Sequence, residues 1–173
     1  MHDGTEREAP GRETAYSVRA ATRADAPILA YQRRAMFEAT GLLAADDGPA
    51  LERAVRGYLD SALADGTFVA WVVRADGRHD EEHIVAGGGI QLRSLMPRPG
   101  HLDGAPEALI VSMWTEPAHR RRGLGTRVLD AMLAWCRARG IRRLMLHASS
   151  DGRPLYAGRG FKATNEMRLE LTP

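Results

Sequence analysis

The feature that most constrains the fold of this chain is a strand-loop-helix segment centred on Arg120-Arg121-Arg122-Gly123-Leu124-Gly125-Thr126. The apolar run Ala108 to Trp114 before it has strand composition, and an apolar-periodic helix follows it. Two glycines at the start of a helix let the backbone approach a bulky anion closely. The free N–H groups and the helix dipole attract that anion. We therefore expect an anion-binding loop at this junction.

The spacing of this loop differs from that of the two best-known phosphate loops. No Lys-Ser/Thr pair follows it, as a P-loop requires, and no third glycine stands where a dinucleotide-binding fold places one. The pattern that remains is Arg120-x-x-Gly123-x-Gly125. A nucleic-acid patch is the weaker interpretation of the arginines, because no basic ribbon interleaved with aromatic residues accompanies them. We expect no nucleic-acid partner.

Hydrophobic periodicity divides the rest of the chain into helices and strands. The strand before the loop, the helix after it and a strand at 144–146 form a βαβ unit, so the two strands should be parallel. The triplet Gly87-Gly88-Gly89 indicates a bulge or a close approach of the backbone. The other predicted elements are a strand at 16–21, helices at 22–37 and 47–65, a hairpin of strands 67–74 and 83–95 with a turn at Asp76-Gly77, a loop at 96–105, a short helix around 155–156 and a final hairpin at 161–171.

Length and composition predict one domain at residues 16–173, preceded by a polar, disordered tail at residues 1–15. The tail has no apolar core of a signal peptide, and no apolar run approaches the ~20 residues that cross a bilayer. We therefore expect a soluble, cytoplasmic protein without a membrane partner. The segment His79 to His83 has two histidines four apart, but it lacks the glutamate of the zinc-protease motif directly after the first histidine, so we expect no metal.

Taken together, these residues resemble the GNAT superfamily of N-acetyltransferases. The resemblance rests on the loop Arg120-x-x-Gly123-x-Gly125 after a strand and Glu116-Pro117, and on the continuation through the helix and strand to Met145. It also rests on the late segment at 148–161, which contains Tyr156 and Gly160-Phe161. The resemblance implies an α/β (α+β) fold with a strongly bent mixed β-sheet, in which splayed central parallel strands are flanked by helices.

The resemblance also implies a cosubstrate, a reaction and a set of site residues. Acetyl-CoA would be the acetyl donor, and a primary amine would attack it directly in a ternary complex. Tyr156 would be the general acid that protonates the leaving thiolate, because a phenol with a pKa near ~10 can donate to a thiolate. Glu38 and Glu116 are candidate substrate-binding residues. The implied acetyl-CoA-binding residues are Met113, Trp114, Thr115, Arg120, Arg121, Arg122, Gly123, Leu124, Gly125 and Thr126.

Several alternatives stay open at this stage. The acceptor is unassigned, with small amines, aminoglycosides, amino acids and protein N-termini all compatible with the sequence. A non-catalytic acyl-CoA-binding regulatory module is the main alternative to an enzyme, and an interaction protein on the same fold is a second. The chain could also form a homodimer. The candidates for the general base are Glu38, His101, Glu116, His119 and His147, and spacing favours none of them.

Overall fold

The computed structural model describes residues 15–44, 46–76, 83–97, 99–169 and 171. Its five strands form one sheet in the order β1-β2-β3-β4-β5, antiparallel from β1 to β4 and parallel between β4 and β5. The elements are β1 (Tyr16–Ala20), the 3₁₀ turn η1 (Arg23–Asp25), α1 (Ala26–Ala39), α2 (Gly48–Asp65), β2 (Phe68–Ala75), β3 (His83–Arg93), β4 (Glu107–Thr115), the 3₁₀ turn η2 (Pro117–His119), α3 (Leu124–Ala138), β5 (Leu144–Leu146) and α4 (Arg153–Ala157).

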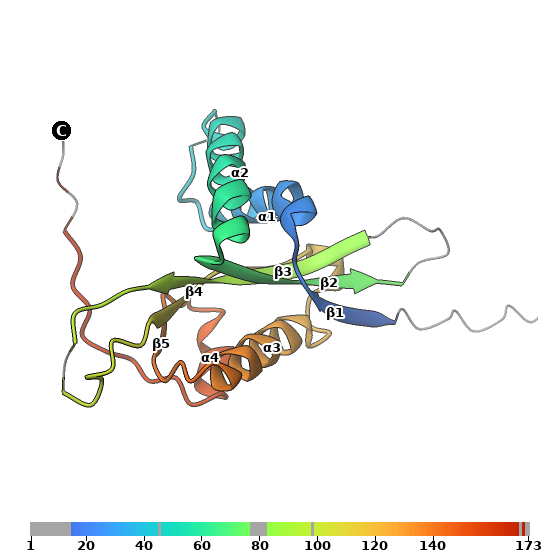
Figure 1. Cartoon of the computed structure of the whole chain (residues 1–173). Coiled ribbons are helices and arrows are strands. Elements are labelled where there is room, and N and C mark those ends of the chain that lie inside the picture. The colour runs from blue at the N-terminus through green and yellow to red at the C-terminus, as the bar shows by residue number, and fades with distance from the viewer. Residues whose placement is uncertain (1–14, 45, 77–82, 98, 170, 172–173) are drawn as a thin grey trace, which may run out of the picture.

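Two layers of helices cover the sheet, with α1 and α2 on one face and α3 and α4 on the other (Figure 1). Strand β2 is buried on both faces because its side chains alternate between two hydrophobic clusters. The first cluster contains Trp71, Val73 and Ala75 with the apolar stripe of α3, and the second contains Phe68, Ala70 and Val72 with α1 and α2.

The predicted parallel pair is confirmed, and its strands separate after a short contact. Pairing between β4 and β5 ends at Ile110 and Leu146, whereas β4 continues to Thr115. The register of β4 against β3 shifts in the same region, where Ser112 has a left-handed φ of 58°. Because the described residues place no strand beside the last five residues of β4, this stretch has a free edge facing away from β3.

The glycine triplet of β3 lies where other groups approach the backbone closely, as its sequence predicts. A Cβ atom at Gly87 would stand 2.5 Å from the amide oxygen of Gln32. Equivalent atoms at Gly88 and Gly89 would collide with Met113 and Phe68 respectively. Glycine therefore lets helix α1 and the side chains of β2 and β4 pack directly against the middle of the sheet.

A buried ion pair fixes the start of α1 against β1. The Asp25 carboxylate accepts hydrogen bonds from both terminal nitrogens of Arg19, at 2.8 and 2.9 Å. It also accepts from the backbone N–H of Thr22 at 2.7 Å, as in a capping box. These hydrogen bonds, that to Arg19 above all, hold the pKa of Asp25 below its ordinary value.

The predicted C-terminal hairpin at 161–171 is wrong. Residues 161–169 and 171 contain no strand, so β5 is the edge of the sheet in the described chain. This segment runs past the end of the sheet without joining it (Figure 1). Its apolar residues alternate as a strand pattern requires, but Met167, Leu169 and Leu171 are 82–95% exposed and pack against nothing among the described residues.

Other predictions concern residues that the structure leaves undescribed. The N-terminal tail lies outside the described residues except for Ala15, and the turn after Asp76 and most of the segment His79 to His83 lie outside them as well. Among the residues that are described, no helix has the length and apolarity needed to cross a membrane.

Candidate active site

The loop between β4 and α3 has the backbone geometry of an anion-binding site. Arg121 and Gly123 both have left-handed φ angles, 62° and 75°, and helix α3 begins directly after them. Within the described chain, none of the amides of residues 121–126 donates to a backbone carbonyl; the first amide that does so is that of Arg127, to Gly123. Several free N–H groups thus converge at the positive end of a helix, which is the arrangement that binds phosphates.

Two of the three arginine side chains of this loop, Arg120 and Arg122, contact neighbouring residues. The Arg120 side chain donates to the carbonyl of Thr115 at 3.1 Å and lies over the Trp114 ring, 4.9 Å from its centroid. Arg122 donates to the Tyr16 hydroxyl at 3.0 Å. These contacts keep positive charge near the free amides, although the amides rather than the guanidinium groups are pre-arranged for a ligand.

Helix α4 packs beside the loop and places Tyr156 on its buried side. A Cβ atom at Gly125 would lie 3.5 Å from Leu155, and Arg159 forms a bidentate ion pair with Asp130 of α3 at 2.6 and 2.9 Å. Tyr156 is 9% exposed, and its ring lies edge-on to Phe161. Burial raises the pKa of the Tyr156 phenol above its ordinary value, so the hydroxyl keeps its proton at neutral pH.

The free edge of β4 lies between this loop and the opposite layer of helices. The stretch of β4 beyond its pairing with β5 contains Met113, Trp114 and Thr115. Met113 packs against the same hydrophobic cluster that contains Tyr156. An extended amide-bearing arm could therefore add itself to this edge as a peptide adds to a sheet.

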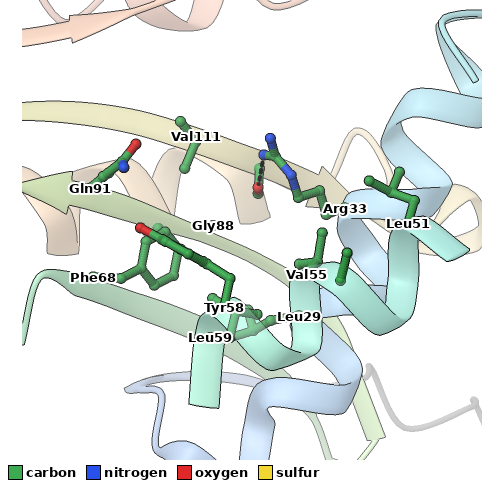
Figure 2. Close-up of a pocket in the computed structure, with 13 residues that line it drawn as sticks. Leu29, Arg33, Leu51, Val55, Tyr58, Leu59, Phe68, Gly88, Gln91 and Val111 are labelled. Atoms are coloured by element: carbon green, nitrogen blue, oxygen red, sulfur yellow. Dashed lines mark hydrogen bonds between the residues drawn. The ribbon is translucent and has the colours of Figure 1, made fainter. Parts of the chain in front are cut away.

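On the other face of the sheet, a cavity of about 380 Å³ opens between the helices and β4. Ser112, which forms the bulge of β4, is one of the residues that line this cavity. Figure 2 shows Arg33 reaching from α1 across this cavity, with the aromatic rings of Tyr58 and Phe68 on its other side. The lining residues are Leu29, Arg33, Leu51, Ala54, Val55, Tyr58, Leu59, Phe68, Gly88, Gly89, Gln91, Val111 and Ser112.

Comparison with known proteins identifies this arrangement. The acetyltransferase (GNAT) family matches residues 27–161, which is most of the chain. The match includes the loop between β4 and α3, the cavity and Tyr156. The chain belongs to the GNAT acetyltransferase family. The resemblance seen in the sequence is thus confirmed, as is the mixed α/β sheet flanked by helices.

Solved GNAT structures resemble the chain over most of its length. A GCN5-related N-acetyltransferase from Ralstonia eutropha JMP134 is 29% identical, with a TM-score of 0.79 over 91% of this chain and 99% of the other. A predicted acetyltransferase from Clostridium acetobutylicum, solved with acetyl-CoA, is 28% identical, with a TM-score of 0.75 over 91% and 96%. A Trypanosoma brucei acetyltransferase at 18% identity and a TM-score of 0.66, over 91% and 100%, shares the fold. No curated protein matches the chain.

The GNAT fold does not bring the two predicted substrate carboxylates to the cavity. Glu38 pairs with Arg34 one helical turn earlier, at 3.0 Å, and does not line the cavity. Glu116 accepts a hydrogen bond from the Trp114 indole at 3.0 Å and lines a separate hollow together with His119. Both carboxylates thus have partners within the chain.

The candidate general bases are spread around the GNAT domain. Burial, and then the charges of Arg122 and His83, lower the pKa of His119, which favours the neutral imidazole; its Nδ1 lies 3.0 Å from the Tyr16 hydroxyl. His147 contacts Glu166 at 2.6 Å on an exposed surface. His101 lines a small hollow near the loop before β4. None of the three histidines lines the cavity under α1 and α2.

Sequence reasoning missed two polar groups of this GNAT domain. Arg33 lines the cavity, and the signal that could have found it is its position four residues from both Leu29 and Phe37, on the apolar side of a predicted helix. Gln32 is fully buried over Gly87, and in the described protein neither its amide nitrogen nor its oxygen has a hydrogen-bond partner. A glutamine in an amphipathic helix carries no comparable sequence signal.

Proposed function

We propose that this protein is an N-acetyltransferase that moves the acetyl group of acetyl-CoA directly to a primary amine. The observation that carries the proposal is the set of free amides at residues 121–126, which opens beside the unpaired edge of β4. The amides would hold the pyrophosphate of the cosubstrate. The backbone of Met113, Trp114 and Thr115 would hold its pantetheine arm, with the side chains of Arg120, Arg121 and Arg122 adding positive charge.

In this proposal, the two reactants bind on opposite faces of the sheet. The loop and α4 lie on the α3 face, whereas the cavity lies under α1 and α2, and the bulge of β4 at Ser112 adjoins the cavity. A thioester laid along the free edge of β4 would meet an amine from the cavity beside this bulge. Backbone N–H groups next to Ser112 would stabilise the negative charge that develops on the carbonyl oxygen.

Tyr156 is the proposed general acid. The amine nitrogen forms a bond to the carbonyl carbon, the carbon–sulfur bond breaks, and the sulfur takes the phenolic proton. The nitrogen releases a proton, which restores the neutral phenol after the transfer. Burial of Tyr156 supports this role, because its raised pKa keeps the donor protonated across the pH range in which amines become nucleophilic.

Titration with acetyl-CoA tests the binding half of the proposal. We expect measurable heat in calorimetry and a rise in melting temperature, since a ligand at 100 times its Kd stabilises the folded state by about 2.7 kcal/mol. Adenosine, which lacks both the pyrophosphate and the pantetheine arm, is the control and should give neither signal. Absence of both signals at millimolar acetyl-CoA would remove the basis of the proposal.

Release of free thiol tests the catalytic half. Amine panels incubated with acetyl-CoA should yield coenzyme A at a rate above the rate without amine. A regulatory module that only binds acyl-CoA would show the heat and the melting shift but no amine-dependent thiol. The two measurements together separate the enzyme from this alternative.

We also propose that the protein forms a homodimer through its C-terminal segment. Met167, Leu169 and Leu171 alternate along an extended, exposed segment, and the outer edge of β5 has no strand partner in the described chain. Strands with free edges and apolar faces pair with other chains. Light scattering should give a mass near twice 18.9 kDa for the parent. It should give a monomer for Leu169→Asp, and a monomeric parent contradicts the proposal.

A further inference from the structure

The cavity under α1 and α2 is lined by one charged group that has no counter-ion in the part of the chain that the structure describes. Arg33 is the only Asp, Glu, Lys or Arg among the described lining residues. Its one hydrogen bond runs from Nη1 to the Ser112 hydroxyl, at 2.8 Å, and within the described chain it makes no ion pair with a carboxylate. By contrast, the neighbouring Arg34 is paired with both Glu38 and Glu52.

The surroundings of Arg33 make a positive charge without a counter-ion energetically unfavourable. The guanidinium lies over the Phe37 ring, 4.9 Å from its centroid, and burial lowers the pKa of Arg33. An arginine has five N–H donors, so the bond to Ser112 leaves donors free to face the cavity. A planar guanidinium with free donors at the wall of an apolar cavity matches the two oxygens of an anion.

Most of the remaining lining is apolar, the exceptions being Gln91, Ser112 and the hydroxyl of Tyr58. Leucine, valine and aromatic side chains from α1, α2 and β2 face the guanidinium across the cavity (Figure 2). The volume of about 380 Å³ lies at the lower end of the ~300–1,000 Å³ range of small-molecule sites. The cavity therefore fits a small amphipathic molecule better than an extended or polar one.

We propose that the acceptor of this acetyltransferase is a small primary amine with an apolar body and an anionic oxygen group, and that Arg33 binds this anion. The inference rests on the proposed function. Ser112 connects the proposed anion site to the proposed site of acetyl transfer. It accepts the hydrogen bond from Arg33, and it forms the bulge beside which the acetyl group would lie. An anion on Arg33 would thus place the amine of a short molecule next to the bulge.

The same charge disfavours strongly cationic acceptors. A polyamine or an aminoglycoside would bring several positive charges to a lining that offers no carboxylate among its described residues. Glu38, the sequence candidate for binding a cation, lies outside the cavity and is already paired. Burying a second positive charge beside Arg33 is unfavourable in an apolar setting.

Matched acceptors test the anion. Thiol release is measured with L-leucine, with L-leucinamide and with the phosphonate analogue of leucine, which share one apolar side chain. We expect kcat/KM at least 10-fold higher for one of the two anionic compounds than for the amide. The amide has the less basic amine, so amine ionisation favours it, and a preference for the anion must come from binding. The comparison of leucine with its phosphonate distinguishes a carboxylate site from a phosphate site.

Substitution of Arg33 tests the assignment of the anion-binding group. Arg33→Met should raise KM for the preferred anionic acceptor by about 10- to 100-fold with a smaller change in kcat, and should leave leucinamide unaffected. Arg33→Lys should recover part of the lost affinity. Arg56→Met removes the same charge from an exposed position of α2 outside the lining and should change neither value. Binding of acetyl-CoA, measured by calorimetry, should be the same in all of these proteins.

The outcomes that overturn this inference differ from those that overturn the proposed function. Equal rates for leucine and leucinamide, or faster turnover of cationic amines, contradict the anion site but leave an acetyltransferase. Equal losses for anionic and neutral acceptors in Arg33→Met show that Arg33 only connects α1 to β4, which also contradicts it. A protein that binds no acetyl-CoA and turns over no amine contradicts both.

Discussion

The two faces of the sheet offer different chemical groups to their proposed ligands. On the α3 face, the candidate groups are backbone amides of residues 121–126 and of the β4 edge, whose positions follow from local chain conformation. On the α1 and α2 face, they are side chains from five separate elements around a cavity, with Arg33 as the only charged one among the described lining residues. The first kind of site requires a particular short sequence, whereas the second can be built from many.

This difference explains why the cosubstrate was easier to recognise than the acceptor. A left-handed residue before a helix favours glycine, and a backbone that approaches a phosphate favours another, so the loop carries a recognisable pattern. An apolar cavity needs only volume and apolar side chains, which every helix of the domain also supplies to the core. Substitutions on each face should therefore have different effects on catalysis, stability and acetyl-CoA affinity.

The largest expected effect is on the α3 face. Tyr156→Phe should lower kcat by about 100-fold or more, the usual contribution of a general acid, while the Kd of acetyl-CoA changes less than twofold. The phenyl ring should keep the packing against Phe161. Steady-state kinetics and calorimetry on the same samples measure the two quantities. If kcat is unchanged, the proton comes from another group.

The start of α1 should be the most acid-sensitive part of the acceptor face. Asp25→Asn should lower the free energy of unfolding at pH 7 by about 2 kcal/mol, because the carboxylate has charged and backbone hydrogen bonds in a buried site. The folded-state pKa of Asp25 is depressed, so this contribution is present above the ordinary pKa of 3.8 and is lost as the pH falls below it. Urea unfolding at pH 7 and pH 3 should show the parent and variant converging in acid. A constant difference would assign the effect to packing.

The two loop glycines should respond in opposite ways. Gly125→Ala places its methyl group in ordinary contact with Leu155, so thermal stability should hold, yet the Kd of acetyl-CoA should rise about 10-fold because the methyl occupies the approach of the pyrophosphate. Gly123→Ala should instead cost about 1 kcal/mol of stability, since its φ of 75° is left-handed. Calorimetry and thermal unfolding of both variants check this pair. Unchanged affinity in Gly125→Ala would move the ligand away from this residue.

The smallest expected effect concerns the amide of Gln32. Gln32→Met should raise the free energy of unfolding by about 1 kcal/mol, because it replaces a buried polar group, which has no hydrogen-bond partner among the described residues, by an apolar one of similar size. Denaturant unfolding measures the change. A loss of stability would show that the amide is satisfied within the folded protein. Acetyl-CoA affinity should stay the same, because Gln32 belongs to α1 and this helix covers the face of the sheet opposite α3 (Figure 1).

The sequence was most informative where short-range order decides the structure. The strand before the loop, the helix after it and the parallel crossover were all predicted, because hydrophobic period and glycine placement are local properties. The prediction of a final hairpin at 161–171 was wrong for a related reason. Apolar residues do alternate there, but alternation indicates only that one side of a segment is apolar, not which residues it packs against. Nothing in the described chain provides that cover for Met167, Leu169 and Leu171.

The sequence by itself determined the strand, loop and helix around Gly123 and the parallel crossover, since these depend on backbone conformation and periodicity that neighbouring residues set. Its resemblance to the GNAT superfamily also implied the family and the mixed sheet flanked by helices, which the comparisons confirm. Only the tertiary structure decided that Glu38 is already paired with Arg34, that Arg33 has no counter-ion among the described residues and that Ser112 joins it to the bulge of β4. Arg33 and Ser112 are 79 positions apart in the chain. The charge that faces a cavity depends on which distant elements pack together, and that information is not contained in the spacing of residues along any one of them.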